Sequence, residues 1–564
     1  MSRNRRAWRL AVPLAVVALI AGACSSGNTG GTAAPAPGAE AQKAGQNDIN
    51  PMDVSKLKPG GDFRWAIAEI PPNFNRNQVD GSLSDNADIM SSMMPRAFLA
   101  DASGTPQINK DYFTDIKLTS TDPQQVITYT INPKAKWSDG TNLTWQDLDA
   151  QFKALNGADT AYRVSSSTGY SDIEKVTQGT DERQAVVTFK NKFSDWQSLF
   201  SPLYPKTLNA TPETFNTGLA AKPGVTAGPF KFDSVDQTAK KLTVKPDPNW
   251  WGAKPVLNSI IYVALDISAQ VQALVNNEID YTNIGSSVND NKTARATQGV
   301  VVRQALAPDY RHITFNGAQG SILADKDLRV AIMKGINRDG IAQALLNGVS
   351  NSPKTLGNHI YVEGLQGYQD NSAVVKYDKA AAAAALDNLG WKLNGNTRSK
   401  DGKNLEIRDV IPTGVAPSAQ EAQLAQQNLA EIGVTLKIET VPTAGFFKQF
   451  VNTGNFDITH FAWLGTPFPV SSSGSIYGLY PDIQQNYGRI GTPEVNDLFK
   501  QANAELDPAK KITLANDIDK KIWDEGFSLL LYQRPQNHAV RSTIANFGSP
   551  GFAAVDYTKI GFTA

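Results

Sequence analysis

Cysteine and histidine are both scarce in this chain of 564 residues. The sequence contains one Cys and four His. A single thiol excludes an intramolecular disulfide, a CxxC redox pair and a zinc ribbon. No His has a second His or a Cys at the spacing of metal ligands; the four are His312, His359, His460 and His538. We therefore expect no cofactor and no metal site.

An excess of charge of either sign is also lacking. Lys and Arg together number 54, as do Asp and Glu, so the formal net charge is zero. A nucleic-acid-binding protein normally has a basic face or a basic block of sequence, and this sequence has no such block. Apolar residues make up 41% and charged residues 19% of the chain, which is ordinary for a soluble globular protein. We expect no nucleic-acid partner.

The motifs of the common secreted hydrolases and nucleotide-binding proteins are absent as well. The sequence has no GxSxG, no HExxH, no GxxxxGKS or GxxxxGKT, and no EF-hand loop. Carboxylate pairs such as Asp172 and Glu174 could act as acid–base partners, but such pairs more often lie on solvated faces. We expect no enzymatic activity, and a secreted hydrolase is the most distant alternative.

Residues 1–23 have the parts of an export signal. Arginines come first, and the apolar run Leu10–Ile20 is too short to span a bilayer, which needs about 20 residues. Small residues then precede Cys24, the sole thiol. The arrangement resembles a lipoprotein signal, in which the Cys thiol is acylated and the Cys becomes the mature N-terminus, although Ala21 stands where Leu is usual. An ordinary secretory leader is the alternative, and Arg5-Arg6 faintly resembles a twin-arginine leader.

Residues 24–58 are rich in Ser, Gly, Ala and Pro and contain no aromatic residue. Such a segment buries too little apolar surface to offset chain entropy, so we expect a flexible tether. An acyl group on Cys24 would then hold the rest of the chain just outside the cell membrane. We therefore expect an extracytoplasmic, lipid-anchored protein, since no later stretch reaches transmembrane length.

Strand-like and helix-like segments alternate after the tether. Enrichment in Val, Ile, Thr and Phe predicts strands at Asp62–Ile67, Gln125–Ile131, Gln184–Phe189, Lys241–Val244, Ser259–Leu265, Val300–Ala305, Arg311–Phe315, Leu405–Val410, Val434–Thr440 and Phe456–Phe461. Helices are predicted at Trp145–Asn156, Ala269–Asn276, Lys326–Ile336, Arg338–Leu346, Asp378–Leu389, Ala419–Ile432, Glu494–Ala504 and Pro508–Asp524. Gly390 and Gly433 directly follow two of these helices, where a left-handed C-cap is needed. The fold class is therefore α/β with more than one lobe.

Several blocks of sequence, in the same order, resemble the solute-binding proteins of peptide-type ABC importers (family 5). They are Ile131–Thr141 with Leu143, Thr144 and Asp147; Gly228–Phe230 with Asn249–Gly252; His312–Asn316; Lys326–Ala331 with Ile336–Arg338; and Tyr377–Leu386 with Leu389–Trp391 and Asp401–Leu405. Segments 71–75, 317–325 and 540–548 resemble, more narrowly, the actinobacterial, mycobacterial-type oligopeptide-binding lipoproteins. We expect these blocks to form turns and packing contacts and so to identify the fold.

The resemblance implies a two-lobed fold of the periplasmic-binding-protein type, in the large class with an extra subdomain on lobe I. Lobe I then comprises residues 59–85, 186–311 and 530–564, the subdomain comprises residues 86–185, and lobe II comprises residues 312–529. It also implies a function as the receptor of an importer, which binds oligopeptides in a cleft between the lobes and delivers them to ABC permease and ATPase subunits. The lobes are expected to close over the ligand as hinged bodies. We expect a monomer.

The ligand-binding candidates form two groups. The first follows the first strand: Glu69, Ile70, Pro71, Asn73 and Phe74. The second lies in lobe II: Asn316 at the crossover, Trp463, Leu464, Gly465, Thr466 and Phe468 in a segment that resembles a binding stretch of the family, and Tyr487 and Arg489. Arg489 is expected to hold a ligand carboxylate; the alternative is a surface Arg.

Thr466 departs from the family pattern, which has an Asp there that typically pairs with the α-ammonium group of a peptide. A hydroxyl cannot supply an ion pair. Either another carboxylate, Glu69 or Asp457, neutralises the amine, or the ligand lacks a free amine; a third reading is that Thr466 only shapes a turn. The alternatives for function are therefore a receptor for another solute, such as a modified peptide or a glycolipid-like ligand, and a lipoprotein that keeps the fold in a structural or regulatory role.

Overall fold

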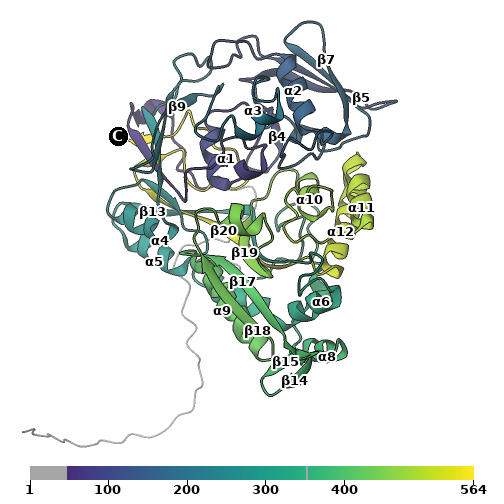
Figure 1. Cartoon of the computed structure of the whole chain (residues 1–564). Helices are drawn as coiled ribbons and strands as arrows, with labels where there is room; N and C mark the ends of the chain where they lie inside the picture. The colour runs from purple at the N-terminus through teal and green to yellow at the C-terminus, as the bar shows by residue number, and fades with distance from the viewer. Residues whose placement is uncertain (1–46, 351–352) are drawn as a thin grey trace, which may run out of the picture. The chain divides into compact units, whose positions relative to one another are not determined.

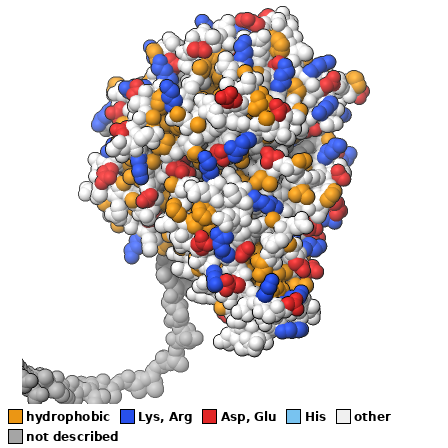
Figure 2. All heavy atoms as spheres, in the orientation of Figure 1, with side chains coloured by type: hydrophobic (Ala, Val, Ile, Leu, Met, Phe, Trp, Pro, Cys, Tyr) orange, Lys and Arg blue, Asp and Glu red, His pale blue; other side chains and the backbone are white. Residues whose placement is uncertain are grey.

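The computed structural model describes residues 47–350 and 353–564. Cys24, the predicted signal peptide and most of the predicted tether lie outside the described residues. Within the described ranges, no helix is both long enough and apolar enough to cross a membrane. Charged side chains of both signs are interspersed on the face drawn in Figure 2, which agrees with the balanced composition.

A single ten-stranded sheet joins the two lobes (Figure 1). Its strands, in spatial order, are β18 (Thr435–Val441), β17 (Glu406–Pro412), β19 (Ile458–Trp463), β13 (Val300–Phe315), β20 (Ser528–Arg541), β12 (Tyr281–Asn283), β2 (Asp62–Ile67), β11 (Ser259–Ala264), β10 (Lys241–Pro246) and β9 (Phe230–Asp236). We call the part of the chain that carries β12, β2, β11, β10 and β9 lobe I, and the part that carries β19, β17 and β18 lobe II.

β13 and β20 are the two crossing strands, and they run antiparallel from one lobe into the other. The predicted ends of lobe II, residues 312 and 529, fall inside them. The prediction of separate strands at 300–305 and 311–315 is wrong, because β13 is continuous. Pro308 lies within a register shift of the ladder, and a proline is tolerated there because no ladder hydrogen bond is required of its nitrogen.

Lobe I has a core on each face of its sheet. Phe63, Trp65 and Ile67 of β2 point to one face and pack with the C-terminal segment that contains Phe547. Ala66 points to the other face, which is covered by α4 (Ile267–Val275) and α5 (Val288–Ala296). This alternation follows from the two-residue period of a strand.

The predicted subdomain contains a four-stranded antiparallel sheet in the order β5 (Phe113–Ser120), β6 (Val126–Ile131), β8 (Gln184–Phe189) and β7 (Ile173–Gln178). α2 (Trp145–Leu155) begins at a capping box, in which the Thr144 N–H donates to Asp147 Oδ2 at 2.8 Å. Because β8 ends at Phe189, this sheet extends past the expected boundary at residue 185.

Helices in lobe II are α6 (Lys326–Gly335), α7 (Arg338–Leu346), α8 (Lys379–Asn388), α9 (Ala416–Ala430), α10 (Pro469–Tyr477), α11 (Pro493–Ala504) and α12 (Pro508–Asp524). Gly390 and Gly433 have φ angles of +88° and +79° after α8 and α9. The Trp391 N–H also donates to the Leu386 carbonyl at 2.9 Å, as a Schellman cap requires. Both predicted C-caps are confirmed.

The remaining elements are short, apart from α1. They are η1 (Val54–Lys56), β1 (Leu57–Lys58), η2 (Val79–Gly81), α1 (Ser84–Ser91), β3 (Phe98–Ala100), β4 (Pro106–Ile108), η3 (Tyr170–Asp172), η4 (Trp196–Ser198), α3 (Pro212–Thr217), η5 (Ser372–Val375), β14 (Lys392–Asn394), β15 (Thr397–Lys400), β16 (Lys403–Asn404), η6 (Phe447–Val451), β21 (Ile544–Ala545) and β22 (Gly561–Thr563). The label η marks a 3₁₀-helix or, for η6, a π-helix.

Candidate functional site

The end of β2 in lobe I touches lobe II directly. Glu69 Oε2 accepts a hydrogen bond of 3.3 Å from the Gly445 N–H. Asp85, in the first turn of α1, holds this end in place, because its Oδ2 accepts from the Ala68 N–H at 2.7 Å and from the Glu69 N–H at 3.4 Å. Burial raises the pKa of Glu69 and raises that of Asp85 to about 6. A strand end from lobe I therefore presents a carboxyl group to lobe II.

Two side-chain hydrogen bonds continue this contact. Gln485 Nε2 donates to Ser82 Oγ at 3.1 Å, next to η2. Gln484 Nε2 donates to Ser167 Oγ in the subdomain, also at 3.1 Å. The segment just before Tyr487 therefore lies against lobe I.

A second contact of lobe I with lobe II is made by Asp195, which follows β8. Its carboxylate forms an ion pair with Lys511 of α12 and accepts a hydrogen bond of 3.3 Å from the Ser471 N–H of α10. The neighbouring Ser194 N–H donates to the Asn503 carbonyl of α11 at 2.6 Å. Both partners of the ion pair are largely buried, with 11% and 15% of their side chains exposed. The lobes are thus in direct contact at two separate places.

An aromatic stack lies at the end of β19 in lobe II. The indole of Trp463 is nearly parallel to the ring of Tyr487 (centroids 5.6 Å apart, 9° between planes) and to that of His312 (5.9 Å, 13°). Phe461 packs edge-on against Trp463 at 5.3 Å. Trp463 is only partly buried. The stack gives lobe II a rigid aromatic surface beside β13.

A loop of lobe II follows the stack and lies against a crossing strand. A Cβ built on Gly465 would lie 2.3 Å from Pro308 Cβ, so only glycine permits this approach. A hydrogen bond from the Gly465 backbone reaches the carboxyl of Asp309, whose pKa is nevertheless raised, with burial the largest cause. The loop that contains Gly465 and the crossing strand β13 therefore form one wall.

An internal charged cluster lies on the lobe I side of this wall. It comprises Arg76, Asp85, Asp88, Arg96, Asp309 and Arg534, which are all partly exposed. Burial is nevertheless the largest cause of the pKa shift of every member, and it raises the pKa of Asp88 to about 8. Charged groups that remain partly exposed while burial dominates their pKa are candidates for contact with a ligand.

A buried ion-pair network anchors both crossing strands close to this wall. Arg311 of β13 donates from Nε and Nη2 to the two carboxylate oxygens of Glu421 on α9, at 2.9 and 2.6 Å. Tyr532 of β20 donates to the same carboxylate at 2.7 Å. Its hydroxyl also lies 3.1 Å from Ser286 Oγ of lobe I. Both crossing strands are therefore tied to one helix of lobe II.

His460 of β19 extends the network to β17. Its Nδ1 lies 3.3 Å from Glu421 Oε2 and its Nε2 lies 3.1 Å from Asp409 Oδ2. Burial alone would lower the pKa of His460, but these two carboxylates raise it to about 9. Burial alone would raise the pKa of Glu421, but Arg311 and His460 hold it at about 2. The network is therefore ionised at neutral pH.

Five of the predicted site residues lie at or beside the lobe contact or the stack. Glu69 and Gly465 contact the opposite lobe or a crossing strand, and Trp463 and Tyr487 form the stack. Thr466 Oγ1 accepts from the Phe468 N–H at 3.1 Å, which is the hydrogen bond of a turn.

Most of the other predicted residues bind groups within the protein or pack in its core. Asn73 and Phe74 are 3% and 1% exposed, and Asn73 Nδ2 donates to the Asn216 carbonyl. Asn316 uses both ends of its amide on lobe II backbone, and Arg489 donates to the carbonyls of Tyr487 and Asn452. Ile70 packs on the lobe I core, Pro71 is buried, Leu464 is exposed, and Phe468 caps α10.

The internal charged cluster was missed by sequence reasoning. The three-residue spacing of Asp85 and Asp88 places them on one face of α1, but this is also the pattern of a solvated helix face. Arg76 and Arg96 are isolated in the sequence, and only the fold brings them close to α1. Nothing in their sequence environment distinguishes them from surface arginines.

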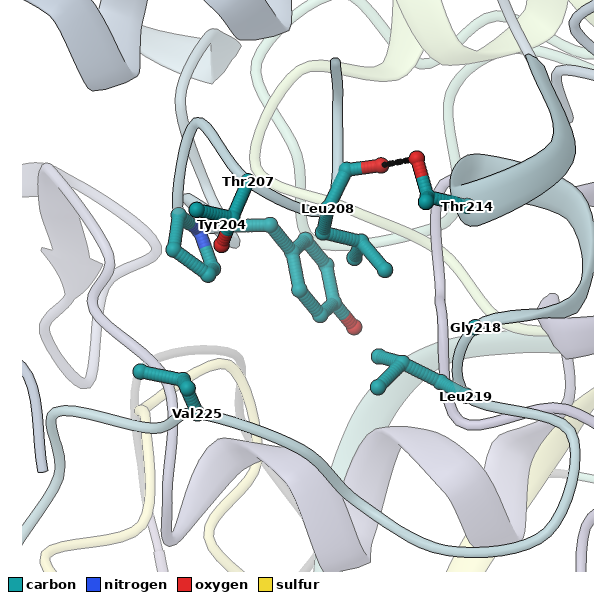
Figure 3. Close-up of a pocket in the computed structure, with 8 residues that line it drawn as sticks. Tyr204, Thr207, Leu208, Thr214, Gly218, Leu219 and Val225 are labelled. Carbon is teal, nitrogen blue, oxygen red and sulfur yellow. Dashed lines mark hydrogen bonds between the residues drawn. The ribbon is translucent and has the colours of Figure 1, made fainter. Parts of the chain in front are cut away.

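A separate cavity of about 200 Å³ lies within lobe I (Figure 3). It is lined mostly by apolar groups, including Leu208, Leu219 and Val225, and by Tyr204, whose hydroxyl donates to the Phe74 carbonyl. Its lining contains no residue of lobe II and no charged side chain, so it is not part of the lobe contact. Within residues 47–350 and 353–564, no group of three or more His, Cys, Asp or Glu side chains is arranged to hold a metal ion.

Comparisons with known proteins agree on one family. The family described as "Bacterial extracellular solute-binding proteins, family 5 Middle" matches residues 106–484. The oligopeptide-binding protein OppA of Mycobacterium tuberculosis (strain H37Rv) is 45% identical over 559 residues, which cover 99% of this chain and 94% of that protein. OppA of Lactococcus lactis subsp. cremoris (strain SK11) is 26% identical over 485 residues, which cover 75% of this chain and 77% of that protein.

Solved structures share the fold at lower identity. The oligopeptide-binding protein AppA of Bacillus subtilis, in complex with a nonapeptide, has a TM-score of 0.78 at 20% identity and covers 90% of this chain and 100% of its own. The lactococcal OppA complexed with an endogenous peptide, in the closed conformation, has a TM-score of 0.72 at 21% identity, with 89% and 100% covered. A periplasmic EDTA-binding protein, EppA, has a TM-score of 0.81 at 24% identity, with 92% and 99% covered.

Proposed function

Since this chain belongs to family 5 of the bacterial extracellular solute-binding proteins, we propose that it is the receptor of an ABC importer. It binds oligopeptides between its two lobes and delivers them to permease and ATPase subunits. It works as a monomer and releases the peptide unaltered, without catalysis. The relatives named as oligopeptide-binding proteins support the ligand class.

One structural observation carries the proposal. β19 pairs with the crossing strand β13, and Trp463 at its end is the register partner of Tyr310. Glu69, two residues past the end of β2, contacts Gly445 of lobe II. Strand ends have free main-chain groups, to which an extended peptide can add as a further strand. Its side chains then reach the aromatic stack and the internal charged cluster, where water adapts the site to different groups.

The structure described here has the lobes in contact, which is the arrangement expected of the ligand-holding state. The contacts at Glu69 and at Asp195 must both break to open the lobes. A peptide shifts the equilibrium toward the closed state only as far as it binds that state better than the open one. The permease then distinguishes loaded from empty receptor by this difference.

Glu69 is the carboxylate that we assign to the peptide amine, in place of the neutral Thr466. It lies at the lobe contact and is partly buried. Asp457, the other candidate, precedes β19 at the end opposite Trp463, and its Oδ2 accepts from the Arg408 N–H at 2.8 Å. Asp457 precedes Trp463 by six positions along the strand, a distance of about 20 Å. Glu69 is therefore the better placed group.

We further propose that Cys24 carries an acyl group, which holds the receptor at the outer face of the cell membrane. The sole thiol of the chain directly follows a signal-like segment, and a tether follows the thiol. The Cys24→Ser variant should appear in the soluble fraction of cells, and the wild type should remain with membranes. Equal membrane retention of both proteins would contradict acyl anchoring.

Binding is tested with pooled peptides of two to nine residues and the mature protein. Mass action predicts a rise in melting temperature of several degrees at saturating peptide, and mass spectrometry of the protein after gel filtration should recover intact peptides. No rise with any pool would contradict the function, and recovery of cleaved peptides would contradict the absence of catalysis.

A second candidate is a receptor for a solute without a free amine, such as a modified peptide or a glycolipid-like ligand. Thr466 favours it, because its hydroxyl is engaged in a turn and supplies no charge. Nα-acetylated peptides that bind better than free peptides would support this candidate. If neither class binds, the remaining alternative is a lipoprotein with a structural or regulatory role.

A further inference from the structure

Two partly exposed arginines differ from the buried arginines of the chain. Within the described ranges, the guanidinium groups of Arg76 and Arg96 have no hydrogen-bond or ion-pair partner, and Arg76 Nε is buried without one. The structural arginines are all engaged with carbonyl, hydroxyl or carboxylate oxygens; they are Arg303, Arg311, Arg329, Arg338 and Arg398. The fold therefore satisfies the arginines that it uses for its own stability, and it leaves these two unsatisfied.

The two arginines lie near each other in the fold, because the Arg76 N–H donates to the Tyr204 hydroxyl at 2.9 Å and the adjoining Leu203 N–H donates to the carbonyl of Pro95, next to Arg96, at 2.9 Å. Arg76 belongs to the segment that leads from β2 to η2, and Arg96 follows the end of α1. Burial lowers the pKa of both, and the charge of Arg76 lowers that of Arg96 further. Both charges also act on the phenol of Tyr557. Two like charges in a weakly polar environment repel each other, so the pair is unfavourable until an anion joins it.

Asp88 is a carboxyl group whose charge acts on Arg76, but among the described residues the two form no ion pair. Burial raises the pKa of Asp88 to about 8, so its carboxyl group is mostly protonated at neutral pH and does not neutralise the arginines. Asp85, one turn earlier on α1, binds the backbone at Glu69 instead. The positive charge of the pair is thus left available next to the proposed peptide site.

We propose that Arg76 and Arg96 form a subsite for a carboxylate of the bound ligand, either the C-terminus of a peptide or an Asp or Glu side chain. Guanidinium groups bind carboxylates in a bidentate manner, and both arginines are partly exposed and therefore within reach. The inference rests on the proposed function, because a peptide supplies the carboxylate. It assigns to this chain a preference for ligands with a negative group.

The test uses three pools of pentapeptides of random sequence without Asp or Glu. One pool has a free C-terminal carboxyl group, the second is amidated, and the third is amidated and carries one Glu. Wild-type protein should bind the free-acid pool, the Glu pool or both at least tenfold more tightly than the neutral amidated pool. In Arg76→Gln and Arg96→Gln this ratio should fall below twofold, with little change for the neutral pool.

Arg295→Gln is the matched control, because Arg295 is an exposed residue of α5 and its replacement removes the same charge. It should keep the wild-type ratio. The melting temperatures of the unliganded Arg76 and Arg96 variants should equal or exceed that of the wild type, since a repulsion is removed. A fall of more than about 5 °C would indicate a structural role and would overturn the proposal, as would a ratio near one in the wild type.

Failure of the proposed function gives a different result. If the wild type binds none of the pools, that function fails, and inorganic phosphate then tests the subsite alone. A rise in melting temperature with phosphate in the wild type and Arg295→Gln, but not in the two variants, would retain an anion subsite. An equal rise in all four proteins would overturn it.

Discussion

The surroundings of Trp463 hold its side chain in place but leave part of it accessible to a ligand. Its ring is held between Tyr487 and His312, and yet its side chain remains partly exposed. Large aromatic side chains fixed in this way lose little entropy on binding and supply much of the contact energy at binding surfaces. The rigidity of the stack is therefore part of the affinity that we expect.

Replacement of this indole should separate binding from folding. We expect Trp463→Ala to weaken peptide binding at least tenfold, while the free energy of unfolding falls by about 2 kcal/mol, since a partly buried aromatic is removed. Titration calorimetry and urea unfolding measure the two quantities. Trp391→Ala, at a partly buried residue on the far side of lobe II, should cost similar stability and no affinity. Equal affinities of Trp463→Ala and the wild type would remove the stack from the site.

Charge at Glu69 should decide the recognition of a free amine. Glu69→Gln keeps the hydrogen-bond acceptor for the Gly445 N–H and removes the negative charge. We expect peptides with a free α-ammonium group to bind about tenfold more weakly to this variant, and Nα-acetylated peptides to bind as before. Asp457→Asn is the control and should change neither affinity. A loss confined to Asp457→Asn would contradict our assignment.

For single residues, sequence reasoning selected candidates by their position in the chain and by their resemblance to the family. Trp463 was predicted because its segment resembles a binding stretch of the family, and Glu69 because it follows the first strand; Trp463 lies beside β13 and Glu69 contacts Gly445 of lobe II. Asn73 and Asn316 were named for their places after the first strand and at the crossover, but their amides hold backbone segments together. A single sequence cannot separate these cases, because an asparagine that binds backbone and one that binds ligand have the same neighbours along the chain.

The crossing strands are the elements on which lobe movement depends. Arg311 and Tyr532 anchor them to α9 through one carboxylate, and the register shifts near Pro308 loosen the ladder close by. The anchored pair Arg311 and Tyr532 therefore lies between two irregular points of the ladder, at Leu306/Tyr310 and at Arg311/His312. We expect bending at the first of these points, where fewer ladder hydrogen bonds resist it.

Ionisation of the network should make stability depend on pH at His460. The pKa of about 9 in the folded protein exceeds the value of about 6.5 for an unfolded chain. The stabilising contribution is therefore complete below pH 6.5 and is lost as the pH rises through 9. We expect His460→Gln to cost about 3 kcal/mol at pH 7 and clearly less at pH 9.5, as measured by urea unfolding.

Other charged and ionisable groups face His460. The pH dependence of stability is therefore assigned to His460 by comparing two variants. Asp409, Glu421, Arg311 and His312 surround it, and Glu421 loses its own stabilising contribution only as the pH falls from about 4.5 to about 2. His538→Gln is the control. The pKa of His538 is lowered to about 4, so its cost should be constant between pH 7 and 9.5. A constant cost for both variants would contradict an ionised His460.

Secondary structure was predictable where the local sequence carries the whole signal. The helices Arg338–Leu346 and Pro508–Asp524 and the strand Asp62–Ile67 have their predicted ends, because caps, prolines and periodicity agree there. Lobe I was predicted to resume at residue 530, but no strand was predicted with bounds there, although β20 spans 14 residues. Its Pro535 and polar residues contradict local strand propensity, and it exists because it pairs with β12 and β13.

For the whole molecule, closure depends on the contact between lobe I and α12. The Lys511–Asp195 ion pair joins them and is largely buried. Any state in which the lobes separate loses this pair and the hydrogen bonds next to it. The contact therefore contributes to the closed state only.

Loss of that ion pair should shift the equilibrium between open and closed states. We expect Lys511→Ala to weaken peptide binding about fivefold, equivalent to about 1 kcal/mol, and to increase the radius of gyration of the free protein in X-ray scattering. Lys520→Ala, which removes an exposed ion pair with Asp517 on the same helix, should do neither. Unchanged scattering and affinity in Lys511→Ala would mean that the contact does not control closure.

The family fold was predictable because its sequence blocks mark turns and caps that every part of the fold requires. The contacts between lobes were not, since Gly445, Ser471 and Asn503 contribute backbone groups, which have no signature in a sequence. The same holds for the internal charged cluster, whose members come from five separate parts of the chain.

The order of strands in the central sheet has a consequence for biosynthesis. β20, at Ser528–Arg541, lies between β12 and β13, although the chain forms both of those strands more than 200 residues earlier. Until the ribosome has made almost the entire polypeptide, the middle of the sheet is missing and neither lobe can complete its core. A chain in that condition cannot complete its fold, and an incompletely folded chain is the form that can be threaded through a narrow export channel.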